Sequence, residues 1–270
     1  MRCGNRSRRS AIPLVIIGLL TGALVEGRVQ AGDPGETARL PSTEYWAKVL
    51  ERHRIDGGVD YAALREARGD LDVFLSLVAI ARPANANREE AMAFWINAYN
   101  AVVLEFVLER YPGIRSVMDF PGFFTQQTTV VAGEEMTLDQ IEARALEPGD
   151  PRVHFGLVCA SRGCPDLREE PYDGRRLDLQ LDDQTRVFMA DREKGLRLDG
   201  EAGVLWVSSI FKWYGGDFTG GSTAVAYLRR GRLVDWIAEY LSDETVSAID
   251  TTRPSVRYIE YDWQLNDRRR

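Results

Sequence analysis

The chain has 270 residues, 44% of them hydrophobic and 28% charged, so it is long and apolar enough to bury a full core. Its formal net charge is -7 at pH 7. Binding to nucleic-acid phosphates needs clustered Lys and Arg, so a chain this acidic is not expected to bind nucleic acid.

The first 31 residues have the order of features that is typical of an export signal. Four arginines among residues 2–9 precede an apolar run from Ala11 to Val25, and Val29-Gln30-Ala31 fits a small-x-small cleavage site. The apolar run is shorter than the roughly 20 residues that cross a bilayer. We therefore expect cleavage, a periplasmic or secreted mature protein, and no membrane span after cleavage. An uncleaved N-terminal anchor is the alternative.

The rest of the chain divides by composition into a linker, one domain and a tail. The linker is expected at residues 32–41, which contain Gly32, Gly35 and two prolines, the domain at 42–262, and a polar tail at 263–270. Apolar residues at helical spacing predict a first helix after Ser42-Thr43, with His53 on the surface near its end. A second helix is expected from Tyr61 to Ala81.

The third expected helix, from Arg88 to Tyr111, is apolar on every side between Ala91 and Val103, which predicts a buried helix. It carries Asn97 and Asn100, three residues apart and so on one face. Buried amides must find hydrogen bonds. Either the two side chains bind a neighbouring backbone, or they line a pocket and bind a substrate.

After Pro112 the pattern changes to short strands mixed with helices, which indicates an α+β fold rather than a doubly wound sheet. We expect the buried helix to pack on a small, mainly antiparallel sheet of short strands and hairpins. The expected elements are a hairpin at 126–137, a helix from Leu138 to Ala145, a strand from Val153 to Val158, a helix from Leu177 to Ala190, a hairpin from Leu196 to Val207, a short helix ending at Trp213, a helix from Ala224 to Leu241 and a strand from Val256 to Tyr261.

The residues best suited to chemistry lie together between Arg152 and Asp166. This stretch holds His154, one of two histidines, with Cys159 and Cys164, the two cysteines that remain if Cys3 is removed with the signal. An exported protein meets an oxidising compartment, so a structural Cys159–Cys164 disulfide is one interpretation.

The second interpretation is a catalytic pair in which Cys159 is the nucleophile and His154 its base. A strand over Val153–Val158 would point the two residues to opposite faces unless it ends or bulges before Cys159. The third is a metal site with Asp166 as a fourth ligand, but the ligand spacing is unusual for zinc and there is no second cluster. We therefore expect no metal and no cofactor.

Two further residues are candidates for the same site. Asp217, in a Gly-Gly-Asp turn, could support the imidazole, and Trp213 could bind a substrate. No Gly-x-Ser-x-Gly motif and no phosphate-binding glycine loop occurs in the sequence.

Three blocks, FWINAYNAVV (94–103), DPRVHFGLVCASRGCPDL (150–167) and SSIFKWYGGDF (208–218), resemble the DUF547 family of domains of unknown function. The family includes exported bacterial proteins and plant proteins with a leucine-zipper segment, and this chain has no zipper heptads. The resemblance implies no activity, substrate or cofactor. It does imply that the polar residues of the three blocks belong to one unit. A likeness to the Cys-His sites of papain and transglutaminases is an analogy only, because here His154 precedes the cysteine.

Two functions follow from these patterns. The first is a thiol-dependent hydrolase or acyltransferase acting on an amide or ester, with Cys159 as nucleophile, His154 as base, Asp217 in support, and Asn97, Asn100 and Trp213 binding substrate. The second is a non-catalytic envelope binding module whose disulfide shapes a loop. In both cases the expected partner is a small molecule or peptide.

Overall fold

The computed structural model describes residues 38–220 and 233–268. The predicted signal sequence, most of the predicted linker and about half of the helix expected at 224–241 lie outside the described residues. Everything that is described falls within one compact unit of the chain.

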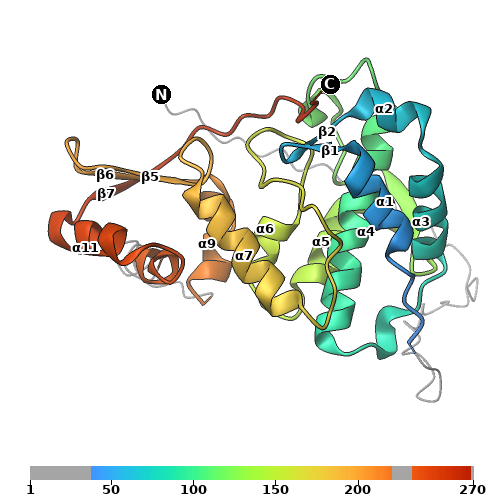
Figure 1. The fold of residues 1–270 in the computed structure, drawn as a ribbon, viewed down its shortest axis with the longest axis horizontal. Coiled ribbons are helices and arrows are strands. Elements are labelled where there is room, and N and C mark those ends of the chain that lie inside the picture. Colours follow the sequence, from blue (N-terminus) through green and yellow to red (C-terminus); the bar gives the residue numbers. More distant parts are fainter. Residues whose placement is uncertain (1–37, 221–232, 269–270) are drawn as a thin grey trace, which may run out of the picture. The chain divides into compact units, whose positions relative to one another are not determined.

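The described residues form an α+β fold, as the sequence predicts (Figure 1). The helices are α1 Glu44–His53, α2 Tyr61–Glu66, α3 Gly69–Ala79, α4 Arg88–Leu108, α5 Leu138–Leu146, α6 Val153–Gly156, α7 Leu177–Ala190, α8 Ile210–Trp213, α9 Gly215–Phe218 and α11 Asp243–Thr252, with 3-10 turns at Pro83–Asn85 and Val117–Asp119. The strands are β1 Arg54–Ile55, β2 Gly58–Val59, β3 Thr128–Val131, β4 Glu134–Thr137, β5 Leu196–Asp199, β6 Val204–Val207 and β7 Ser255–Tyr258.

These strands form three small sheets. β1–β2 and β3–β4 are antiparallel pairs, and β6 pairs with β5 antiparallel and with β7 parallel. The β3–β4 hairpin turns through Ala132 and Gly133, whose φ angles of 54° and 83° suit the tight turns that join twisted strands.

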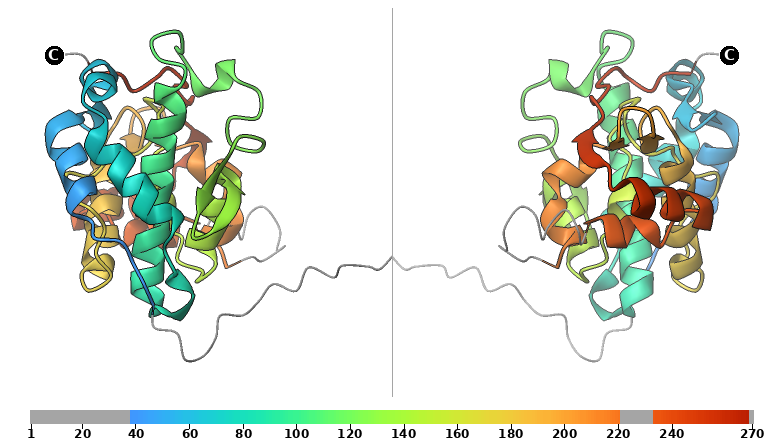
Figure 2. Two further views of the ribbon diagram at one scale, coloured as in Figure 1. Left: turned by 90° about the vertical axis from the view of Figure 1, so that its right-hand side faces the viewer. Right: turned by 90° about the vertical axis from the view of Figure 1, so that its left-hand side faces the viewer.

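Helix α4 is the centre of the first of two hydrophobic clusters. Asn87 caps its start by accepting a hydrogen bond from the Glu90 backbone N–H at 2.8 Å. The helix lies between α3 and α5 (Figure 2). Its side chains are buried on every side from Met92 to Leu104. It is long and apolar enough to cross a membrane by length and composition, but 83% of its most apolar window is buried inside this fold. It is therefore the core helix that the sequence predicts.

Two predictions in the N-terminal half are wrong. The helix expected at 61–81 is two helices, since α2 ends at Glu66 and α3 begins at Gly69, a residue that costs about 1 kcal/mol relative to alanine inside a helix. His53 was expected on the surface, but it is only 6% exposed. It ends α1 where the chain folds back, and its carbonyl accepts from the Asp60 N–H at 2.8 Å.

The second hydrophobic cluster packs the β5–β6–β7 sheet against α7, α8, α9 and α11. Leu205 and Val207 of β6 point into it, as do Phe211 of α8 and Ile249 of α11. Helix α6 joins the two clusters, because Val153 belongs to the first and Phe155 to the second. His154 lies between these two residues in the sequence, so it is held where the two cores meet.

The C-terminal residues differ from the polar tail that was expected at 263–270. Leu265 is 6% exposed and packs in the first cluster, and Asn266 is buried with its side-chain oxygen accepting from the Tyr61 hydroxyl at 2.9 Å. The prediction missed this packing because the segment has only two large apolar residues among many polar ones.

Candidate functional site

The segment that carries His154 is a short helix, not the strand that its apolar run predicts. Pro151 fixes φ near the helical value, and the Asp150 carboxylate accepts from the Arg152 N–H at 3.0 Å, so the chain turns before the apolar run begins. The His154 N–H then donates to the Pro151 carbonyl at 3.2 Å. The strand prediction was wrong because a four-residue helix buried on all sides has the same apolar pattern as a buried strand.

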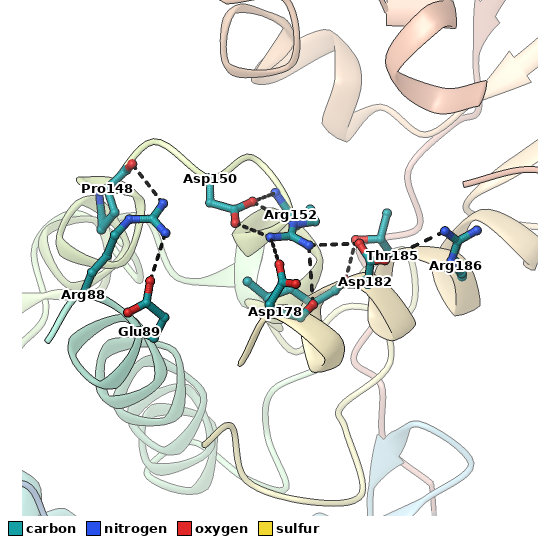
Figure 3. A network of polar contacts seen from close by, with 10 residues as sticks. Arg88, Glu89, Pro148, Asp150, Arg152, Asp178, Asp182, Thr185 and Arg186 are labelled. Carbon is teal, nitrogen blue, oxygen red and sulfur yellow. Dashed lines mark hydrogen bonds and ion pairs between the residues drawn. The ribbon is translucent and has the colours of Figure 1, made fainter. Parts of the chain in front are cut away.

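Arg152 fixes the start of α6 to helix α7 (Figure 3). Its guanidinium contacts Asp150 and Asp178 at 2.7 Å and Asp182 at 2.9 Å. Hydrogen bonds to Asp150 and then to the other two carboxylates raise the pKa of Arg152, so it is always charged. One cation thus holds three carboxylates and the turn that precedes His154.

Asn100 of α4 fixes the chain on the other side of His154. Its side-chain NH₂ donates to the Gly156 carbonyl at 2.9 Å, and its oxygen accepts from the Val158 N–H at 2.9 Å. One helical turn earlier, the Asn97 side-chain NH₂ donates to the Tyr172 carbonyl at 2.8 Å, and the Asn97 side-chain oxygen accepts from the Tyr172 N–H at 3.0 Å. Neither asparagine lines the cavity around His154. Their geometry therefore favours the backbone-binding alternative over substrate binding.

The imidazole of His154 is held by Asp217 and by aromatic rings. The distance from His154 Nε2 to Asp217 Oδ2 is 2.8 Å, and the Tyr214 ring lies against the imidazole with centroids 4.0 Å apart. The His154 side chain is 2% exposed, whereas that of Asp217 is 51% exposed. Asp217 thus joins a buried imidazole to solvent.

The environment of His154 favours the neutral imidazole. Burial lowers the pKa of His154 below its ordinary value of 6.5, and the hydrogen bond and charge of Asp217 oppose this effect only in part. With Nε2–H donating to the carboxylate, the neutral ring carries its free lone pair on Nδ1. Within the described part of the chain, Nδ1 has no hydrogen-bond partner, and it is not among the fully buried polar atoms that lack one. It therefore retains accessible surface.

Cys159 and Cys164 form a disulfide, as the first of the three interpretations predicts. Cys159 consequently has no free thiol in this structure, and a thiolate nucleophile is not present. The Tyr261 hydroxyl donates to Cys164 Sγ at 3.0 Å and lies 3.2 Å from Cys159 Sγ.

The C-terminal segment holds the disulfide loop in place. The Arg162 N–H donates to the Gln264 carbonyl at 2.8 Å, and the Gly163 N–H to the Asp262 carbonyl at 2.9 Å. A Cβ on Gly163 would come within 2.9 Å of the Asp262 backbone nitrogen, so this close approach requires glycine. The pairing brings Tyr261 to the disulfide.

A cavity of about 280 Å³ opens beside His154. One side is formed by an aromatic wall, which we define as Trp213, Tyr261 and Trp263, with ring centroids 4.5 to 5.6 Å apart. The lining residues are Tyr99, Phe124, Thr125, Asp139, Glu142, His154, Leu157, Cys159, Cys164, Pro165, Ile210, Trp213, Tyr214, Tyr261 and Trp263. The cavity therefore gathers both cysteines, His154 and Trp213, which the sequence places in one site.

Glu142 of α5 is the most perturbed acid in this cavity. Burial raises the pKa of Glu142 from 4.5 to about 7, with Asp139 and Asp217 adding to the increase and a hydrogen bond with Tyr214 opposing it. Tyr214 thus contacts both Glu142 and the His154 ring. Perturbed acids in a cavity are typical of functional sites.

Sequence reasoning missed Glu142, Tyr214, Tyr261 and Trp263. Glu142 looks like any acidic residue on a half-exposed helix, and only the packing of α5 on α4 reveals its burial. Tyr261 and Trp263 did carry a signal, since residues two apart share one face of an extended segment.

Among the residues that the structure describes, no group of three or more His, Cys, Asp or Glu side chains is placed to hold a metal ion.

Comparison with known proteins gives one family. Residues 83–189 match the family model described as "Protein of unknown function, DUF547". The matched region contains the first two of the three sequence blocks, with Asn97, Asn100, His154 and both cysteines, while Trp213 and Asp217 lie beyond it. No curated protein and no solved structure matches the chain. Residues 83–189 are therefore similar to the DUF547 family, whose description assigns no activity.

Proposed function

We propose that the cavity beside His154 is a hydrolytic site in which the neutral imidazole, oriented by Asp217, activates water to attack an amide or ester carbonyl. The observation that carries this proposal is the 2.8 Å contact between His154 Nε2 and Asp217 Oδ2 at the wall of an aromatic cavity. A histidine that is buried, neutral and paired with a carboxylate is a typical general base.

The proposed reaction uses the two ring nitrogens in different roles. Nε2–H donates to Asp217, and Nδ1 accepts a proton from water as the water oxygen bonds to the carbonyl carbon. Asp217 stabilises the imidazolium while it exists. The imidazolium then gives that proton to the leaving nitrogen or oxygen as the bond from that atom to the carbonyl carbon breaks, which restores neutral His154.

Water takes the place of the thiol that the sequence suggested. Cys159 is joined to Cys164, so a thiol-dependent reaction would require reduction of the protein first. The periplasmic or secreted location that the sequence predicts suits a lasting disulfide. In this proposal the disulfide is a structural part of the cavity wall.

A non-catalytic binding module is the second candidate. It is favoured by the same disulfide together with the aromatic wall, because the two give a fixed, apolar surface for a ligand without any chemistry. The two candidates share one cavity and differ only in whether His154 transfers a proton.

The test is hydrolysis of a panel of chromogenic esters and anilides by the wild type, His154→Gln and Asp217→Asn. We expect the loss of the general base to lower the rate by about 10²–10⁴-fold in His154→Gln, and Asp217→Asn to lower it less. His53→Gln is the matched control, because His53 is the other buried histidine and lies outside the cavity lining.

The pH dependence gives a second readout. Because burial lowers the pKa of His154, the wild-type rate should rise with pH through a value below 6.5 and then stay level. Asp217→Asn removes a group that favours the imidazolium, so this pKa should fall further. Equal rates in the wild type and His154→Gln would contradict the proposal, and a wild type that binds ligands but hydrolyses none of the panel would favour the binding module.

A further inference from the structure

We propose that the ligand of this cavity carries a positively charged amine or guanidinium group, which lies between the carboxylates of α5 and the aromatic wall. This inference rests on the proposed function where it concerns the reaction, since it names the substrate as an amide or ester that carries a positive charge. The binding itself can be tested without any reaction.

The first support is the sign of the charge. Asp139 and Glu142 line the cavity, Asp217 contacts His154 at its wall, and no Lys or Arg is among the described residues that line it. In the described part of the chain, neither Asp139 nor Glu142 forms an ion pair with a protein cation. This lining favours a cation and opposes a phosphate or carboxylate at the same place.

The second support is the burial of Glu142. A carboxylate removed from water without a cation beside it resists ionisation, which is why burial raises the pKa of Glu142 to about 7. The titratable groups around it are Asp139 on the same helix, Tyr99 of α4, His154 of α6, Tyr214 and Asp217, and none of them is a permanent cation. A ligand cation would supply the missing charge partner.

The third support is the aromatic wall. Ring faces attract an ammonium or guanidinium group within about 6 Å, and their apolar carbon also packs against the alkyl chain that carries such a group. Trp213 is 46% exposed, so part of its ring is free to contact a ligand. The wall faces a space of about 280 Å³, which fits a single lysine-like or arginine-like chain rather than a bulky polymer.

The experiment is a set of binding titrations followed by tryptophan fluorescence, since Trp213 and Trp263 line the cavity. The probes are the methylamides of Nα-acetyl-lysine, Nα-acetyl-arginine, Nα-acetyl-norleucine and Nα-acetyl-glutamate. Norleucine has the lysine chain without the charge. We expect the lysine and arginine probes to bind at least 10-fold more tightly than the norleucine probe, and the glutamate probe most weakly.

Variants of α5 locate the effect. Glu142→Gln should remove most of the preference for lysine over norleucine and leave norleucine binding unchanged. Glu147→Gln is the matched control, because Glu147 caps the same helix but lies outside the cavity lining, and it should keep the full preference. In the wild type, the preference should grow as the pH rises through about 7, where Glu142 ionises.

The outcomes separate this inference from the proposed hydrolysis. Norleucine binding as tight as lysine binding, or a preference that Glu142→Gln leaves intact, would overturn the inference even if esters are hydrolysed. A clear preference for lysine with no hydrolysis of any cationic ester would support the ligand class and remove the hydrolytic proposal.

Discussion

The structure has two groups of three carboxylates near His154, one at the turn before it and one at the cavity beside it. They differ in whether an arginine contacts them. Asp150, Asp178 and Asp182 surround the guanidinium of Arg152, which contacts all three (Figure 3). Asp139 and Glu142 line the cavity and Asp217 contacts His154 at its wall, and none of the described residues that line the cavity is a Lys or Arg. We call the first group the Arg152 cluster and the second the cavity carboxylates.

The difference shows what a cation does to a set of acids. In the Arg152 cluster a protein cation contacts all three acids, so these acids fix the turn before His154. In the cavity, no Lys or Arg among the described residues pairs with Glu142, so burial opposes its ionisation, and a bound cation would favour it. The same residue types are therefore structural in one place and suited to a ligand in the other.

The largest effect should come from breaking the Arg152 cluster. Arg152→Met leaves Asp150, whose side chain is 11% exposed, without its cation, and we expect the free energy of unfolding to fall by about 3 kcal/mol. Urea denaturation at pH 7 measures this. Arg186→Met is the control, since Arg186 is half exposed, lies 3.8 Å from Asp182 and stands 5.4 Å from the centroid of the Tyr240 ring, and its loss should cost less than about 1 kcal/mol. Equal losses in both variants would show that the cluster does not hold α6.

A smaller effect of opposite sign is expected in the cavity. The pKa of Glu142 is raised in the folded state, so its contribution to stability is present below the unfolded value of 4.5 and is lost as the pH rises toward about 7. Glu142→Gln has no carboxyl group to ionise, so its free energy of unfolding at pH 8 should exceed that of the wild type by roughly 2 kcal/mol, allowing for partial solvent access to Glu142.

Urea denaturation at pH 5 and pH 8 checks this prediction. The difference between Glu142→Gln and the wild type should increase with pH, whereas Glu147→Gln should show no such increase. A wild type that gains stability relative to Glu142→Gln between these pH values would mean that Glu142 already has a cationic partner.

Much of the fold could be predicted from local patterns. The bounds of α7 and the β5–β6 hairpin match the expected ranges, because amphipathic spacing and an Asp-Gly turn depend on residues close in sequence. The all-round apolar pattern identified α4 as the buried helix. The same pattern misled at Val153–Val158, where a buried four-residue helix and a buried strand look alike.

The site could be predicted only in part. Several predicted residues stand out as chemical types: His154, both cysteines and Trp213 line one cavity, and Asp217 contacts His154. Asn97 and Asn100 were rightly expected to need buried partners, yet the sequence could not tell a backbone partner from a ligand. Glu142 and Trp263 come to the cavity through contacts between distant segments, and no local pattern records such contacts.

The most direct test of the central claim is the rate of ester hydrolysis by protein that keeps its Cys159–Cys164 bond and has been treated with an alkylating reagent. If His154 and Asp217 act on water, this protein should hydrolyse the ester as fast as untreated protein, and His154→Gln should be about 10²–10⁴-fold slower. Activity that appears only after reduction, and that alkylation of Cys159 then abolishes, would contradict the claim and make Cys159 the nucleophile.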